Sequence, residues 1–139
     1  MYNTNNIQLI LKWYDLNKRD LPWRNANDPY KTWLSEIMLQ QTQVQTVIPY
    51  FNKWMKQFPT LSSVANANLD QVLKSWEGLG YYRRCKNFHQ AAKIVIKDYN
   101  GMIPNDYETL KKLPGLGEYS ASAIMSIAFN EKYPAIDSN

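Results

Sequence analysis

The chain has 139 residues, 45% of them hydrophobic, which is enough to close one core, so we expect a single domain. Sixteen Lys and Arg against twelve Asp and Glu leave a net charge of +4, a modest basic excess that permits an anionic partner without requiring one. The single Cys85 excludes a disulfide or a multi-cysteine metal site built from this chain alone, and no apolar run reaches the roughly eighteen residues of a membrane span.

The first two elements expected along the chain are helices. An amphipathic segment near the N-terminus is marked by Leu9, Trp13 and Leu16. The loop that follows it ends at Asp28, whose side chain suits a helix N-cap, with Pro29 at the first helical position. A second helix is therefore predicted over residues 30–39.

A third helix is expected to follow almost at once. The four residues from Thr42 to Gln45 are typical of a capping box, in which the first and fourth side chains bond each other's backbone amides. This pattern predicts that a helix starts at Thr42 and ends before Pro59. Gln41 would then lie in an exposed joint between two helices.

The middle of the chain also has helical spacing. Asn68 and Gln71 can cap a short helix that runs to residue 76, and the break at residues 78–80 separates it from a longer amphipathic helix that ends near residue 100. No segment alternates apolar and polar residues long enough to indicate a strand. The predicted fold class is all-α.

The last two helices, expected over about residues 106–112 and 117–129, are joined by the tight turn LPGLG. This is a helix-hairpin-helix pattern. Glycines lack Cβ atoms, so a phosphate can approach the backbone while amides at the start of the second helix face the anion. The pattern predicts DNA contacts by Gly115, Leu116 and Gly117, although a plain interhelical turn is an equally good interpretation.

Separated motifs agree in order and spacing with one family. They are LPWR at residues 21–24, LSEIMLQQTQV at 34–44, GLGYY at 78–82, LPGLGEYSASAI at 113–124 and IDSN at 136–139. With these motifs the chain resembles A/G-mismatch adenine DNA glycosylases of the MutY type, in the helix-hairpin-helix or endonuclease III superfamily. The resemblance runs from about Trp13 to the last residue, and it departs at Ser138, where the family usually has Gly.

The resemblance implies two catalytic carboxyl groups. Adenine is a poor leaving group until a ring nitrogen is protonated, so its release needs an acid whose pKa lies near neutrality. The family match assigns this role to Glu36, acting at N7 of adenine, and assigns stabilisation of the positive charge on the sugar to Asp137. The ordinary alternatives are a solvated helix glutamate and an aspartate that merely caps a turn.

Tyr119 bears on the type of reaction. Relatives of the endonuclease III type have a lysine at this position, which attacks the sugar and forms a Schiff base. A phenol cannot form an imine, so the resemblance implies a monofunctional glycosylase with Tyr119 near the reacting sugar. Ordinary helix packing is the alternative for this residue.

Extraction of a base leaves a gap in the duplex, and Gln41 and Tyr81 match the family's wedge positions that fill it. The alternatives are a surface loop residue and a core aromatic residue, respectively. By the same resemblance, the adenine pocket is formed with Arg19, Trp23, Arg24, Leu39 and Asn139. A solvated helix face is favoured over phosphate contact for Arg83, Arg84 and Lys86.

The resemblance also implies a helix-hairpin-helix glycosylase fold with a six-helix-type domain. Residues 1–27 would form an N-terminal helix and loop, and residues 28–139 the DNA-binding and catalytic domain, with the hairpin at 106–129. In relatives, four cysteines for a [4Fe-4S] cluster and a domain that recognises 8-oxoguanine follow the position of Asn139. We therefore expect a chain truncated before the cluster region, with no cofactor or metal of its own.

The expected function is base excision repair: hydrolytic release of adenine mispaired with guanine or 8-oxoguanine in double-stranded DNA. A monomeric bacterial cytoplasmic enzyme without a leader peptide is expected when complete, whereas the fragment would be weakly active or inactive and prone to self-association. A bifunctional glycosylase/lyase and a non-catalytic DNA-binding module remain as alternatives. A cavity shared by Glu36 and Asp137 would favour an enzyme.

Overall fold

The computed structural model describes residues 21–24 and 28–129, and every regular element within these ranges is a helix. The helices are α2 (Pro29–Leu39), α3 (Val44–Gln57), α4 (Leu61–Asn66), α5 (Leu69–Trp76), α6 (Tyr82–Asp98), α7 (Tyr107–Lys111) and α8 (Glu118–Ala128). The all-α prediction is confirmed, while the expected helix of Leu9, Trp13 and Leu16 lies outside the described residues. No helix in the described ranges is long and apolar enough to cross a bilayer.

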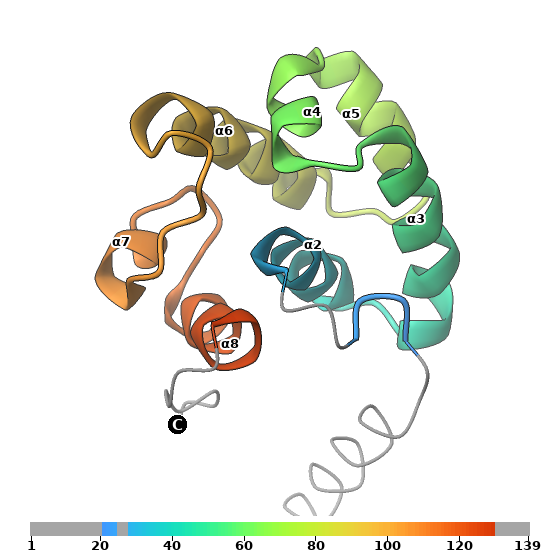
Figure 1. Ribbon diagram of the computed structural model, residues 1–139. Helices are drawn as coiled ribbons and strands as arrows, with labels where there is room; N and C mark the ends of the chain where they lie inside the picture. Colours follow the sequence, from blue (N-terminus) through green and yellow to red (C-terminus); the bar gives the residue numbers. More distant parts are fainter. Residues whose placement is uncertain (1–20, 25–27, 130–139) are drawn as a thin grey trace, which may run out of the picture.

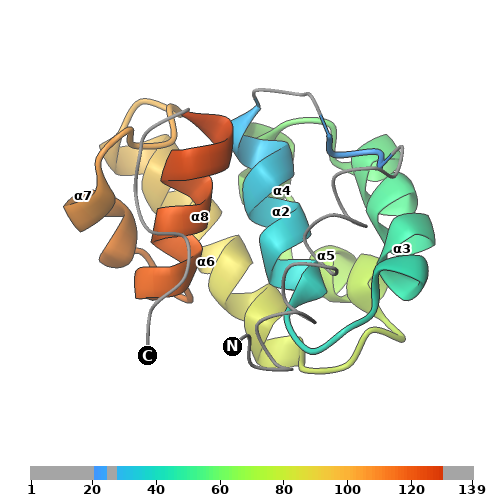
Figure 2. The same ribbon diagram turned by 90° about the horizontal axis from the view of Figure 1, so that it is seen from below.

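Helix α2 lies at the centre of the molecule (Figure 1). It packs between α3 and α8, while α6 packs against α4 and α5, and α7 against α8. Figure 2 shows α2 and α8 side by side, with α6 crossing behind them. Side chains of α2 can therefore take part in two different regions, one shared with α8 and one shared with the start of α6.

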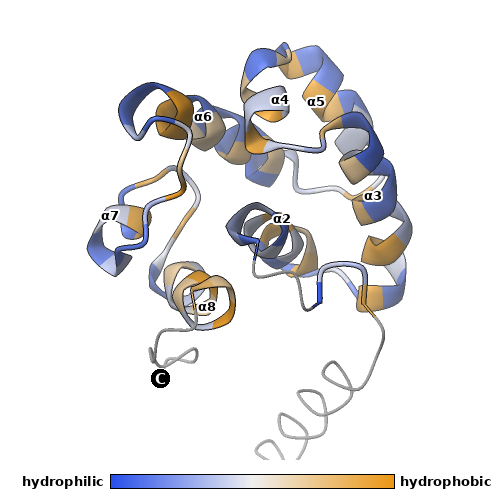
Figure 3. Ribbon diagram, in the orientation of Figure 1, coloured by the Kyte–Doolittle hydropathy of each residue, from blue (hydrophilic) through white to orange (hydrophobic). Residues whose placement is uncertain are grey.

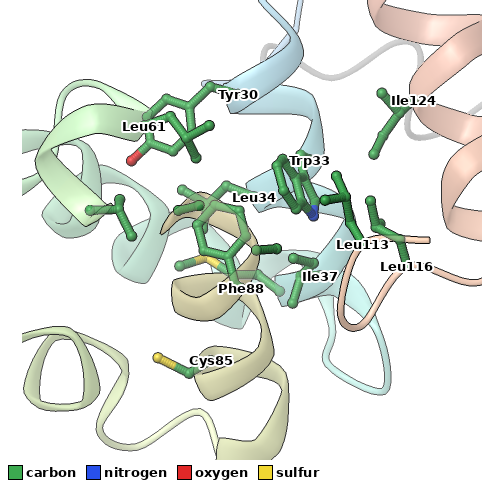
Figure 4. Close-up of a cluster of buried hydrophobic side chains, with 14 of the residues drawn as sticks. Tyr30, Trp33, Leu34, Ile37, Leu61, Cys85, Phe88, Leu113, Leu116 and Ile124 are labelled. Atoms are coloured by element: carbon green, nitrogen blue, oxygen red, sulfur yellow. The ribbon is translucent and has the colours of Figure 1, made fainter. Parts of the chain in front are cut away.

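Large aromatic side chains fill the core around α2. Trp33, Trp54 and Trp76 are fully buried. The Trp33 ring meets the Phe88 ring of α6 edge-on, with ring centroids 4.9 Å apart. Figure 4 shows Trp33 between Phe88 and Leu116 of the hairpin turn, so the same core supports α2, α6 and the turn.

Helix α8 is the most uniformly hydrophobic helix in Figure 3. Its buried residues are mostly small: Ser120, Ala121, Ser122, Ala123, Ile124, Met125 and Ala128. Small side chains allow two helix backbones to approach closely, which accounts for the tight packing of α8 on α2. The first turns of α8 are thereby held close to the middle of α2.

Helix caps read from the sequence are present. The Asp28 carboxylate accepts a hydrogen bond from the Tyr30 amide at 3.0 Å, and Pro29 occupies the first turn of α2. Asn68 and Gln71 bond each other's backbone amides at 2.9 and 3.1 Å, as a capping box requires. These local signals fixed the starts of α2 and α5 correctly.

Two local predictions were wrong. Helix α3 begins at Val44 with an uncapped start, because the Thr42 hydroxyl donates back to the Gln40 carbonyl, at 3.5 Å, and forms no capping box. A helix that the sequence did not predict, α4, begins after Thr60, whose side chain forms a reciprocal capping box with Ser63. The joint between α2 and α3 is consequently longer than expected.

Candidate active site and nucleic-acid interface

Glu36 lies in the middle of α2, where it is half-buried. Burial raises the pKa of its carboxyl from the usual 4.5 to about 7. Among the described residues, no hydrogen bond or salt bridge offsets the loss of water around this carboxylate. An acid in this setting is part-protonated at neutral pH and able to donate a proton.

Tyr119, in the first turn of α8, faces the same region. Its side chain is 53% exposed, so it is not an ordinary packing residue. Partial burial and then the charge of Glu36 raise the pKa of the Tyr119 phenol, which places the two groups within electrostatic reach. The Gln40 amide donates to the Ser120 hydroxyl at 3.1 Å and ties the end of α2 to α8 beside them.

Gln41 and Tyr81 share an unusual backbone conformation. Both have positive φ angles, 62° and 51°, in the left-handed region that costs a residue with a Cβ atom about 1 kcal/mol or more. Both side chains are exposed, Tyr81 by 60%. The exposed joint expected at Gln41 is confirmed, and the alternative of Tyr81 as a core aromatic residue is wrong.

These two residues line one cavity of about 300 Å³. Its other walls come from the end of α2, the start of α6 and the hairpin turn: Ile37, Gln40, Arg83, Arg84, Asn87, Phe88, Pro114 and Gly115. Gln41, Tyr81 and the turn, which are far apart in the sequence, are thus brought to one surface. A base or a phosphate at this surface would meet all three.

Arg84 does not lie on a solvated helix face, contrary to the favoured interpretation of the sequence. Its guanidinium donates to the carbonyls of Ile37, at 2.6 Å, and Gln40 at the end of α2. It also lies 5.2 Å from the centre of the Tyr81 ring. Burial lowers the pKa of the Arg84 guanidinium. The carbonyl acceptors at the end of α2 hold the side chain in place.

The two glycines of the hairpin turn differ. Gly115 has a φ of 82°, and a Cβ atom there would lie 2.9 Å from the Asn87 Cβ atom, so both conformation and space require glycine. Gly117 has a φ of −99° and open space around it, so the fold does not require glycine there. The Leu116 side chain is buried, and its amide donates to the Leu113 carbonyl at 3.1 Å, so Leu116 stabilises the turn.

The remaining pocket candidates are only partly described. Trp23 is half-buried and meets the Phe51 ring edge-on at 5.1 Å, and Leu39 is half-buried against the core. Arg24 donates its amide to the Leu21 carbonyl at 3.0 Å. Three predicted site residues lie outside the described residues: Arg19, Asp137 and Asn139. Their roles stay predictions.

Sequence reasoning missed several residues that build these sites. They are Gln40, Ser120, Asn87 and, in its buried role, Arg84. Each acts on a residue distant in sequence, so no local pattern marks it. Asn87, for example, matters only because the hairpin turn lies across it.

The described residues do not fit a metal or an iron–sulfur cluster. No group of three or more His, Cys, Asp or Glu side chains in these ranges converges on a point. Cys85, the only cysteine of the chain, is buried, and burial raises its pKa to about 12, which opposes formation of a thiolate ligand. No chemical step is therefore assigned to such a group.

Residues 34–139 match the profile of one family, described as HhH-GPD superfamily base excision DNA repair protein. This chain belongs to that superfamily. The match includes α2 from Leu34 onward and every later helix of the described structure.

Named HhH-GPD relatives are similar over nearly the whole chain. Adenine DNA glycosylase of Buchnera aphidicola subsp. Baizongia pistaciae is 48% identical over 133 residues, which are 95% of this chain and 38% of that protein. Adenine DNA glycosylase of Homo sapiens is 47% identical over 94% of this chain and 26% of its own length. The chain thus spans well under half of these curated relatives.

Solved structures with the same fold include a thermostable thymine-DNA glycosylase, with a TM-score of 0.81 and 28% identity. That match covers 94% of this chain and 61% of the other. Endonuclease III in a non-covalent complex with DNA has a TM-score of 0.76 at 21% identity, over 99% of this chain and 65% of the other. The predicted helix-hairpin-helix glycosylase fold is confirmed.

Proposed function

We propose that this chain carries the catalytic centre of an adenine DNA glycosylase that releases adenine mispaired with guanine or 8-oxoguanine from double-stranded DNA. The observation that carries the proposal is Glu36, a half-buried carboxyl whose pKa is raised to about 7 beside the exposed Tyr119. A module that only binds DNA has no use for a part-protonated acid next to an anionic ligand.

The reaction follows from the chemistry of the leaving group. The Glu36 carboxyl donates its proton to a ring nitrogen of the extruded adenine, and the glycosidic C–N bond then breaks with its electron pair going to the base. The sugar is left with a positive charge, which water neutralises by adding its oxygen and losing a proton. Asp137 is the proposed second carboxylate that stabilises this charge.

The DNA would be held at the surface shared by Gln41, Tyr81 and the hairpin turn. Gln41 and Tyr81 are exposed at the same surface, as residues that enter the gap left by an extruded base must be. The open backbone at Gly117 and the uncapped start of α8 leave amides for a phosphate. The proposed partner is double-stranded DNA containing an A:G or A:8-oxoguanine pair, and the proposed location is the cytoplasm.

The decisive test replaces Glu36 with Gln in the full-length protein and measures single-turnover adenine release from an A:8-oxoguanine duplex. We expect the rate to fall by about 10²- to 10⁴-fold while mismatch affinity stays within a few-fold of wild type, because only proton donation is lost. Glu77→Gln is the matched control, since Glu77 is exposed and outside the site. Release by Glu36→Gln near the wild-type rate would refute the proposal.

A second measurement separates the lyase alternative. Because Tyr119 cannot form an imine, borohydride should trap no covalent complex with DNA through this position. Efficient trapping that survives replacement of each nearby lysine would move the protein to the lyase class. Trapping that one lysine substitution abolishes would identify that lysine as the attacking amine.

A further inference from the structure

Gln41 and Tyr81, the proposed wedge residues, come from two separate turns with no hydrogen bond between them among the described residues. Gln41 follows the end of α2, and Tyr81 precedes α6. Both backbones are in the left-handed region, which isolated turns of non-glycine residues adopt rarely. Something in the fold must therefore hold both turns in place at once.

The Arg84 side chain contacts both turns. At the end of α2 its Nη1 atom donates to the carbonyl oxygens of Ile37, at 2.6 Å, and Gln40, with a longer contact of 3.4 Å to Met38. These carbonyls belong to the last turn of α2 and its C-cap, Gln40, where a positive charge is favoured. Their other donors are more distant: the Gln40 amide lies 3.3 Å from the Ile37 carbonyl oxygen, and the Thr42 hydroxyl lies 3.5 Å from that of Gln40. Gln40 directly precedes Gln41.

On the other side, Arg84 contacts the turn before α6. Its Nη2 atom lies 3.4 Å from the Gly80 carbonyl oxygen, and the guanidinium lies 5.2 Å from the Tyr81 ring centre. The Trp76 ring, 5.3 Å away, offers a second aromatic contact. A planar guanidinium can satisfy carbonyls in its plane and rings against its faces together, which an ammonium group cannot.

We propose that Arg84 is a positioning residue that couples the Gln41 turn to the Tyr81 turn, so that both wedge residues enter the duplex as one unit. This inference rests on the proposed function, since it assigns Arg84 to the extrusion of a base. Arg84 itself does not touch the reacting atoms. Its effect would be on base extrusion and on the order of the two turns, ahead of the chemical step.

The test compares Arg84→Met, which keeps the length and loses all donors, and Arg84→Lys, which keeps the charge, in the full-length protein. The control is Leu61→Ala, a core truncation on α4, a helix that contributes no residue to the cavity. Extrusion is followed by the fluorescence of 2-aminopurine placed beside the mispaired adenine, and general binding by affinity for a matched duplex.

For Arg84→Met we expect the extrusion signal and the rate of adenine release to fall by at least about tenfold, with matched-duplex affinity within about threefold of wild type. Arg84→Lys should be intermediate, because one ammonium group cannot reach both turns. Leu61→Ala should lower thermal stability and leave the extrusion signal per folded molecule unchanged. If Arg84→Met and Leu61→Ala behave alike, Arg84 serves only the fold and the proposal is wrong.

Hydrogen exchange measured without DNA tests the coupling of the two turns independently of the proposed function. In Arg84→Met, loss of the coupling should speed amide exchange by about tenfold in both residues 40–42 and residues 79–82. In Leu61→Ala, exchange in these two segments should not increase more than in the rest of the chain. Should the wild-type protein release no adenine, the proposed function fails, and this exchange pattern still decides the role of Arg84. Faster exchange in one turn alone would overturn the coupling.

Discussion

Helix α2 takes part in two regions that treat polar groups in opposite ways. In the region shared with α8, the Glu36 carboxyl loses water without gaining a partner among the described residues, and its pKa rises to about 7. In the joint where α2 meets α6, the Arg84 guanidinium is also partly buried but has several carbonyls and two rings around it. The first region is suited to proton transfer and the second to holding shape.

The same contrast holds for the two glycines. Gly115 belongs to the packed joint, where Asn87 leaves no room for a Cβ atom. Gly117 belongs to the open side, where nothing described lies near it. A residue type alone therefore does not tell which region it serves, and substitutions in the two regions should differ in whether they affect stability or function.

The largest expected effect on stability is that of Arg84→Met. The substitution removes the charged donor from the Ile37 and Gln40 carbonyls, which keep only longer bonds of 3.3 and 3.5 Å in a partly buried place, and should lower the free energy of unfolding by about 3 kcal/mol. Urea unfolding at pH 7 measures this change. A loss within about 0.5 kcal/mol, the range of ordinary surface substitutions, would contradict the description of the joint as a held structure.

Glu36→Gln should have the opposite effect on stability. The pKa of Glu36 is higher in the folded chain, about 7, than its ordinary value of 4.5, so ionisation disfavours the fold. The contribution of the protonated Glu36 carboxyl to the free energy of unfolding is fully present below pH 4.5 and is lost as the pH rises to about 7. At pH 8 the Glu36→Gln variant should therefore be more stable than wild type by about 3 kcal/mol.

Urea unfolding of wild type and Glu36→Gln across pH 4 to 8 checks this sign. The two curves should meet near pH 4 and separate as the pH rises. A wild-type chain that gains stability relative to Glu36→Gln between pH 5 and 7 would mean that Glu36 has a favourable partner when ionised.

The sequence predicted local features of both regions better than distant ones. Asp28 and Asn68 cap helices as expected, because capping depends on residues two or three positions away. Glu36 was identified only through the family resemblance, since its spacing on α2 is that of a solvated residue. Its pKa is raised by burial, and the helices that pack against α2, α3 and α8, are not placed there by any local pattern.

Arg84 shows why the rest could not be predicted. Within the sequence it stands among charged residues at the start of an amphipathic helix, which is typical of a solvated face. Its partners are the Ile37 and Gln40 carbonyls at the end of α2, which are more than forty residues away in the sequence, so no local pattern indicates that Arg84 packs there.

The pH dependence of catalysis should follow the same acid. Because the protonated form of Glu36 is the proton donor, the single-turnover rate should be flat below pH 7 and fall by about tenfold for each unit above it. Quenched single-turnover reactions between pH 5 and 9 measure this profile. A rate that rises through pH 7 would indicate that Glu36 acts as a base.

The smallest expected effects come from the glycines, and they separate the two regions most finely. Gly115→Ala forces a Cβ atom into the left-handed conformation and against Asn87, and should cost about 1–2 kcal/mol of stability. Gly117→Ala has an allowed φ and open space, so its stability should stay within about 0.5 kcal/mol of wild type.

If a phosphate approaches the backbone at Gly117, Gly117→Ala should instead weaken binding to matched and mismatched duplexes alike, because backbone contacts carry no sequence information. Loss of mismatch binding alone would mean that the turn reads the mispair, and unchanged affinity for both duplexes would remove Gly117 from the interface.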